Sequence, residues 1–126
     1  MKYSYAPEIK EIAKEIISLL KMHHIKIDDV ECIRSHGSKS RAIARCHGLV
    51  KVMQLGLNRD AFYVLEFIHE KFDFLHEQDK IKTIIHELMH IPHNFGGGFK
   101  HHDYVTTKNV NILYEEFIKR KNFGLK

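Results

Sequence analysis

The stretch EQDKIKTIIHELMHIP, residues 77–92, decides how this chain folds. Its apolar residues recur at three- and four-residue steps, acidic residues occupy the first turn, and Pro92 follows the last apolar position. This pattern predicts an amphipathic helix from about Glu77 to Ile91 that packs one wide face on a core. The apolar face consists of Ile81, Ile84, Ile85, Leu88 and Met89.

The same helix carries the pattern H-E-x-x-H in His86, Glu87 and His90. Residues four apart lie one above the other on a helix, so both imidazoles can bind one zinc ion. Glu87 is rotated away from the two histidines but can contact a water on the zinc, which favours the role of general base. The pattern could arise by chance in a chain with 11 histidines, but the independently predicted helix argues against that.

A catalytic zinc needs a third protein ligand and one open position. His102 is the favoured candidate and His101 the next, because the three glycines at 96–98 allow the chain to turn back toward the metal. A thermolysin-like arrangement would instead take a glutamate from a later helix, and Glu115 or Glu116 would serve.

The rest of the chain is predicted to form further helices and short strands around this helix. Apolar periodicity predicts a first helix from Pro7 to about His23, and a last helix capped by Thr106 or Thr107. Three strands are expected, at 30–34, 42–45 and 62–68, the third running into 72–75, while 49–57 fits a helix or a strand equally well. This order of elements predicts one α+β domain covering residues 1–126.

Composition excludes several other classes of protein. With 126 residues, 44% of them hydrophobic and 29% charged, the chain is expected to form one compact domain rather than a disordered segment. Two cysteines are too few for a disulfide-stapled scaffold, and no apolar run is long enough for a membrane helix. The first residues also lack the apolar stretch of a signal peptide, so a soluble, cytoplasmic protein without a membrane partner is expected.

A basic segment precedes the third strand. It contains Arg34, Lys39, Arg41 and Arg45, in a chain whose net charge is +4. These side chains are candidates for contacts with substrate carboxylates or with the phosphates of a nucleic acid. The more ordinary interpretation is that these charges lie on a solvent-exposed face of the sheet. Aromatic residues that would stack on the bases of a nucleic acid do not alternate with them.

Two blocks of sequence resemble a known family. The run HELMHIP at 86–92 with NFGGGFKHH at 94–102, and the run RSHGSKSRAIAR at 34–45, are similar to motifs of archaeal and phage zinc metallopeptidases, which are similar in outline to SprT-like zincins. The resemblance spans about residues 30–118. It implies a minimal zincin-like domain, with a small mixed or antiparallel sheet packed against an N-terminal helix, the H-E-x-x-H helix and a C-terminal helix.

The same resemblance implies one zinc ion per chain, with His86, His90 and His102 as ligands and Glu87 as the catalytic residue. The family pattern has Pro where this chain has His101, so both neighbouring histidines stay candidates. The expected activity is zinc-dependent hydrolysis of a peptide or protein substrate, which by analogy with zincins would lie along the strand at 62–68. The alternatives are a zinc protein associated with nucleic acid and a protease acting on DNA-bound proteins.

Overall fold

The computed structural model describes residues 1–100 and 104–124, and it has the predicted α+β architecture. The elements in chain order are β1 (Lys2–Tyr5), α1 (Pro7–Leu19), a 3-10 turn (Ile27–Asp29), β2 (Val30–His36), β3 (Ala44–Gly48), α2 (Lys51–Gly56), β4 (Tyr63–Ile68), α3 (His69–Phe72), α4 (Glu77–Met89) and α5 (Thr107–Gly124).

The four strands form one mixed sheet in the order β1-β2-β4-β3. β2 and β4 are parallel, whereas β1 pairs with β2 and β3 pairs with β4 in the antiparallel sense. β4 is therefore inserted between two strands that precede it in the chain. The expectation that the strand at 62–68 presents an edge to a substrate is wrong, because β4 is paired on both sides, and the outer strands are β1 and β3.

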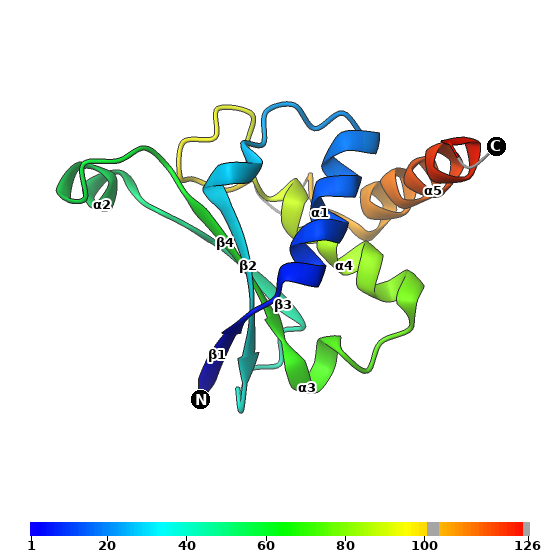
Figure 1. Ribbon diagram of the computed structural model, residues 1–126, viewed down its shortest axis with the longest axis horizontal. Coiled ribbons are helices and arrows are strands. Elements are labelled where there is room, and N and C mark those ends of the chain that lie inside the picture. Colours follow the sequence, from blue (N-terminus) through cyan, green and yellow to red (C-terminus); the bar gives the residue numbers. More distant parts are fainter. Residues whose placement is uncertain (101–103, 125–126) are drawn as a thin grey trace.

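The helices α1 and α4 cover one face of the sheet, and α5 packs beside them (Figure 1). Alternate residues of β4, namely Tyr63, Leu65 and Phe67, point into this layer and are fully buried. Leu88 of α4 and Ile16 of α1 are also fully buried in this core. The burial of apolar area along α1 and α4 is what fixes their orientation on the sheet.

The three long helices agree with the sequence prediction. α1 begins at Pro7, which suits the first turn because proline lacks an N–H and has a helical φ. α5 is capped as expected, since the backbone N–H of Asn109 donates to Oγ1 of Thr106 at 3.1 Å. Among the described residues, no helix is long and apolar enough to cross a bilayer.

Three local features differ from the prediction or were left open by it. β1 was not expected, the segment at 49–57 contains the helix α2, and α3 follows β4 directly where the strand was expected to continue into 72–75.

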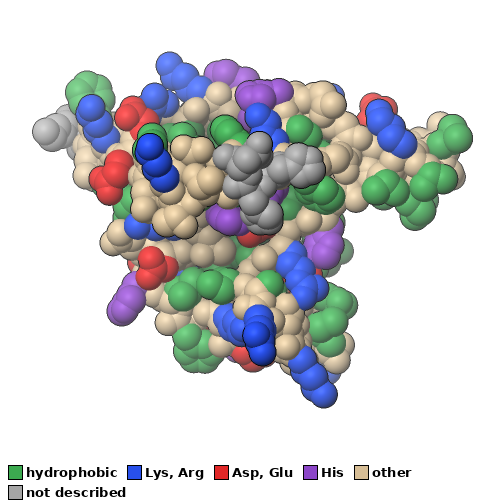
Figure 2. Space-filling model, turned by 180° about the vertical axis from the view of Figure 1, so that it is seen from behind, with side chains coloured by type: hydrophobic (Ala, Val, Ile, Leu, Met, Phe, Trp, Pro, Cys, Tyr) green, Lys and Arg blue, Asp and Glu red, His purple; other side chains and the backbone are tan. Residues whose placement is uncertain are grey.

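α2 projects away from the sheet and buries none of its residues (Figure 1). Hydrophobic side chains gather on this projecting lobe (Figure 2). They are the exposed Val50, Val52, Met53, Leu55 and Leu57.

Candidate metal centre

The C-terminal turn of α4 brings together His86, Glu87 and His90, which we call the helix group. The Nε2 atoms of the two histidines lie 3.3 Å apart, and both rings are partly exposed. Their positions follow from the helix, because Ile85 and Leu88 on the opposite side are fully buried against the core. The packed face of α4 thus fixes the direction in which the two imidazoles point.

The distance between the two nitrogens fits a shared zinc ion. Zinc bonds of about 2.0–2.1 Å in a tetrahedral arrangement place two ligand nitrogens about 3.3–3.4 Å apart. The Nδ1 atom of His90 is 2.9 Å from the carbonyl oxygen of Lys100, to which a proton on Nδ1 is donated. This hydrogen bond leaves the lone pair on Nε2, which is the tautomer that a metal-binding histidine needs. The two histidines are therefore suited to hold a metal ion.

The glycine loop that follows α4 is fixed by contacts with the sheet. Tyr63 accepts a hydrogen bond from the N–H of Gly97 and donates one to the carbonyl of Gly98, each at 2.8 Å. Gly97 has a φ of +100°, and a Cβ there would lie 2.3 Å from the carbonyl oxygen of Leu49. Glycine is required for this close approach. The loop ends at Lys100, whose N–H donates to the carbonyl of His90 at 2.8 Å, so the loop returns to the helix group.

Glu87 is the buried member of the helix group, with 5% of its surface exposed. Burial disfavours the charged form of the carboxyl and raises the pKa of Glu87 to about 7. A perturbed carboxyl beside two histidines is typical of a catalytic site rather than of a structural ion pair.

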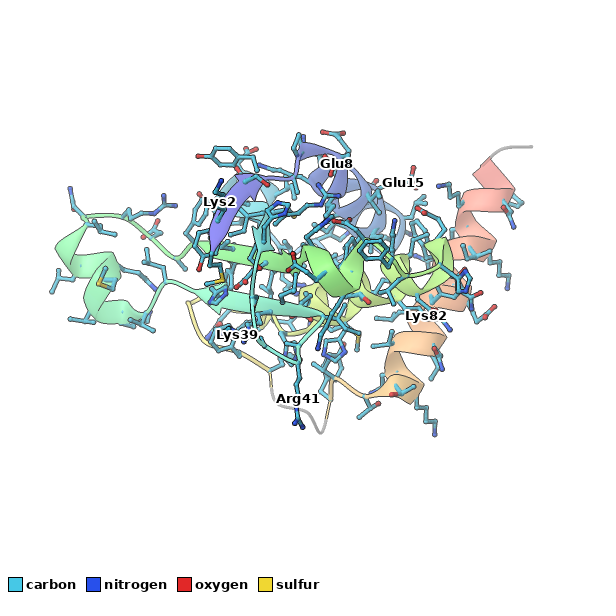
Figure 3. All side chains as sticks on the ribbon, turned by 90° about the horizontal axis from the view of Figure 1, so that it is seen from below. Lys2, Glu8, Glu15, Lys39, Arg41 and Lys82 are labelled. Carbon is cyan, nitrogen blue, oxygen red and sulfur yellow. The ribbon has the colours of Figure 1, made fainter. Side chains whose placement is uncertain are left out.

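Two adjoining hollows of about 530 and 440 Å³ meet at the helix group, and we call them together the cleft. Ala44 on the edge strand β3, together with His86 and Glu87, lines both of them. The cleft therefore runs between β3 and α4. Figure 3 shows Arg41 on the connection before β3 and Lys82 on α4, and these two cations line the larger hollow.

Arg34 of the basic segment is held within the fold. Its guanidinium donates to both carboxylate oxygens of Asp73, at 2.9 and 3.1 Å, and also pairs with Glu8. The hydrogen bonds to Asp73, together with those to Glu8, raise the pKa of Arg34 above its ordinary value. Two carboxylates thus neutralise this residue.

The other members of the basic segment lie elsewhere. Arg34 and Arg45 are opposite successive residues of β4, so they lie on opposite faces of the sheet. Lys39, Arg41 and Arg45 are exposed, and Arg45 lines the smaller hollow. Of the four basic residues in this segment, only Arg41 and Arg45 therefore line the cleft.

The structure describes two of the four candidates for the third ligand, Glu115 and Glu116. His101 and His102 lie outside the described residues. Glu116 accepts a hydrogen bond from Arg120 at 2.8 Å, on the part of α5 where Arg120 also reaches the carbonyl of Leu19 in α1. Glu115 is exposed on α5.

The structure also brings residues to the cleft that sequence reasoning did not select. Among them are Lys82, Thr107 and Asn111. Lys82 precedes His86 by four residues, so its position on the same side of α4 was available from the helix period. Thr107 and Asn111 belong to the first turns of α5, and only the packing of α5 on α4 brings them near the helix group.

A comparison with protein families gives one match over nearly the whole chain. The model of the family described as putative phage metallopeptidase matches residues 1–121. No curated protein and no solved structure matches the chain.

Proposed function

Because the chain belongs to the putative phage metallopeptidase family, we propose that it is a zinc-dependent peptidase whose metal is held by the helix group. The observation that carries the proposal is the separation of 3.3 Å between the Nε2 atoms of His86 and His90, with Nδ1 of His90 bonded to Lys100. Zinc suits this donor set because it accepts imidazole ligands in a tetrahedral site with one open position.

We propose His102 as the third ligand, with His101 as the alternative. Support comes from Lys100, which is joined to His90 by two hydrogen bonds of 2.8 and 2.9 Å. Because the structure holds Lys100 beside His90, a residue that follows Lys100 closely in the sequence suits the role of third ligand. Glu115 and Glu116 remain further alternatives, although Glu116 already pairs with Arg120.

When bound, zinc lowers the pKa of a coordinated water and polarises the carbonyl of the peptide bond. Glu87 accepts a proton from the attacking water at its carboxylate and transfers it to the nitrogen of the leaving amine. Its burial removes the water that would otherwise solvate the carboxylate, which makes proton transfer to Glu87 more favourable. The peptide C–N bond breaks without an acyl-enzyme intermediate.

The edge strand β3 offers a platform for an extended peptide. The residues that flank β3 form backbone hydrogen bonds with the β4 side. The N–H of Leu49 donates to the carbonyl of Phe62, and the N–H of Ile68 donates to the carbonyl of Ile43. Alternation along an antiparallel pair therefore turns the main-chain groups of Ala44 and Cys46 outward, beside the cleft. We propose that substrate pairs with these groups, and that Arg41 and Arg45 contact its carboxylates.

Binding of nucleic acid through the basic segment is not the function we favour. Phosphate recognition needs several unpaired cations on one surface. Arg34 is paired with Asp73 and Glu8, and it lies on the sheet face opposite to Arg45.

Zinc content and peptide hydrolysis together test the proposal. We expect His86→Ala to lose one zinc equivalent relative to the wild type, while His23→Ala, which changes an exposed histidine outside α4, keeps it. Glu87→Gln should keep the zinc and lose about 10²–10⁴-fold in the rate of hydrolysis, the range typical of general acid–base catalysis. The matched control is Glu77→Gln, an exposed position at the other end of α4.

The proposal is overturned if zinc-supplemented wild type binds no zinc, or if Glu87→Gln hydrolyses peptides as fast as the wild type. His102→Ala and His101→Ala, measured in the same way, identify the third ligand. If both keep the zinc, Glu115→Gln and Glu116→Gln come next.

A further inference from the structure

A second group of metal-ligating side chains lies where β2 ends beside α3, and we call it the strand-end group (Figure 1). It consists of His36, the last residue of β2, and of His69 and Glu70, which begin α3. One potential ligand atom from each of the three lies within 4.8 Å of the other two. None of them is among the described residues that line the cleft.

His69 is oriented in the manner of a metal ligand. Its Nδ1 atom lies 2.6 Å from Oδ2 of Asp73, and Asp73 also accepts two hydrogen bonds from Arg34. Because both oxygens of Asp73 already accept hydrogen bonds from Arg34, Nδ1 of His69 is the donor to Asp73, and the lone pair is on Nε2.

His36 and Glu70 are linked through the turn that follows β2. Both carboxylate oxygens of Glu70 lie 3.1 Å from the N–H of Gly37, which donates to them. The φ of Gly37 is +84°, a left-handed conformation that favours glycine at this turn. The ring of His36 lies 4.8 Å from that of His69, and its Nε2 is 3.2 Å from Oγ of Ser4. A proton on Nε2 donated to Ser4 leaves the lone pair on Nδ1.

We propose that the strand-end group binds a divalent transition-metal ion, zinc being the ion that best suits two imidazoles and one carboxylate. Zinc bonds of about 2.0–2.2 Å require the ligand atoms to lie about 3.3–3.6 Å apart, so the widest separation must shorten by roughly 1–1.5 Å. Glu70 is exposed, so its side chain can rotate to bring a carboxylate oxygen closer to the two histidines. One oxygen then binds the metal while the other keeps its bond with Gly37.

Metal at this site joins two parts of the chain that are distant in sequence, the end of β2 and the start of α3. The connection at 37–43 starts at Gly37, and its later residues Arg41 and Ile43 form a wall of the larger hollow. A metal that fixes Gly37 through Glu70 therefore also restrains this wall. Because the ligands converge only in the folded chain, binding also stabilises the fold. The site does not depend on the peptidase activity proposed for the helix group.

The test uses the variant His86→Ala/His90→Ala, in which the helix group has lost both histidine ligands. Zinc is titrated into this folded variant by calorimetry, and cobalt is used as a second probe because its visible spectrum reports the coordination. We expect one zinc equivalent to bind and the thermal midpoint to rise with zinc. Adding Glu70→Gln or His36→Ala should weaken zinc binding at least tenfold, whereas adding His23→Ala should not.

Glu70 is exposed, so Glu70→Gln preserves folding even if His36→Ala does not. Absence of zinc binding in the folded His86→Ala/His90→Ala variant overturns the second site. Binding that survives both Glu70→Gln and His69→Ala also overturns it, since the metal would then be held elsewhere. Neither result bears on the helix group, whose test compares His86→Ala with the wild type.

Discussion

The helix group and the strand-end group contain similar side chains but are supported in different ways. His86 lies in the last turn of α4 and His90 is its C-cap, and the fully buried Leu88 lies between them in sequence, on the face that packs against the core. His36 and His69 come from separate elements, and the surrounding support is ionic, through the pairing of Arg34 with Asp73. The first geometry therefore depends on apolar packing and the second on charge.

The largest effect is expected from removing the packing behind the helix group. Leu88→Ala deletes a side chain that is 0% exposed, and it leaves a cavity under the turn that carries both histidines. We expect a loss of about 2–5 kcal/mol in the free energy of unfolding, measured by urea denaturation. A loss below about 1 kcal/mol would show that α4 is not fixed by its buried face.

Gly97→Ala tests the loop that returns to the helix group. The new Cβ would lie 2.3 Å from the carbonyl oxygen of Leu49, at a φ of +100°. We expect a loss of about 1–3 kcal/mol in stability, and weaker zinc binding because Lys100 moves away from His90. Gly98→Ala is the matched control, since a Cβ there meets nothing within 4 Å. Equal effects of the two substitutions would contradict the role given to Gly97.

Asp73→Asn tests the charge support of the strand-end group. Asp73 is bonded to Arg34 and His69, and we expect the loss of its charge to cost about 1–2 kcal/mol at pH 7. The pKa of Asp73 is lowered in the folded chain, because the hydrogen bonds from Arg34 and His69 outweigh the effect of burial. Its stabilisation is therefore complete above the unfolded value of about 3.9 and is lost as the pH falls through the folded pKa.

The measurement is urea denaturation of the wild type and of Asp73→Asn from pH 7 down to pH 2. We expect the two stabilities to converge at the acidic end, where Asp73 is protonated. Asp28→Asn, at an exposed position, is the control and should follow the wild type throughout. A constant difference between wild type and Asp73→Asn over the whole range would show that shape rather than charge supports this end of the sheet.

The same contrast explains what could be predicted from the sequence. The sequence predicts the helix group because one helix period places His86, Glu87 and His90 together. The apolar face of α4 predicts the helix itself independently. No spacing in the sequence links His36 with His69, because they meet only through the parallel pairing of β2 with β4. That pairing requires β4 to enter between β2 and β3, which no local pattern in either strand signals.

Two other misses have the same origin. All four residues of β1 are exposed, so this strand has no alternation of buried and exposed positions to reveal it. The sequence groups Arg34 and Arg45 in one basic segment but does not show which face of the sheet each of them occupies. Arg34 and Arg45 lie on opposite faces because they oppose successive residues of β4, and this follows from register rather than from composition.

The smallest effect is expected from a second leucine-to-alanine substitution, this time in α2, the helix that follows β3. Leu55 of α2 is 84% exposed, and α2 buries none of its residues. Leu55→Ala should therefore change the free energy of unfolding by no more than about 0.5 kcal/mol in urea denaturation, against the larger loss for Leu88→Ala. Apolar side chains stabilise the fold only where they leave water, and α2 keeps its own exposed. A loss comparable with that of Leu88→Ala would mean that this lobe is buried in the protein as it exists in solution, so oligomeric state should be measured on the same samples.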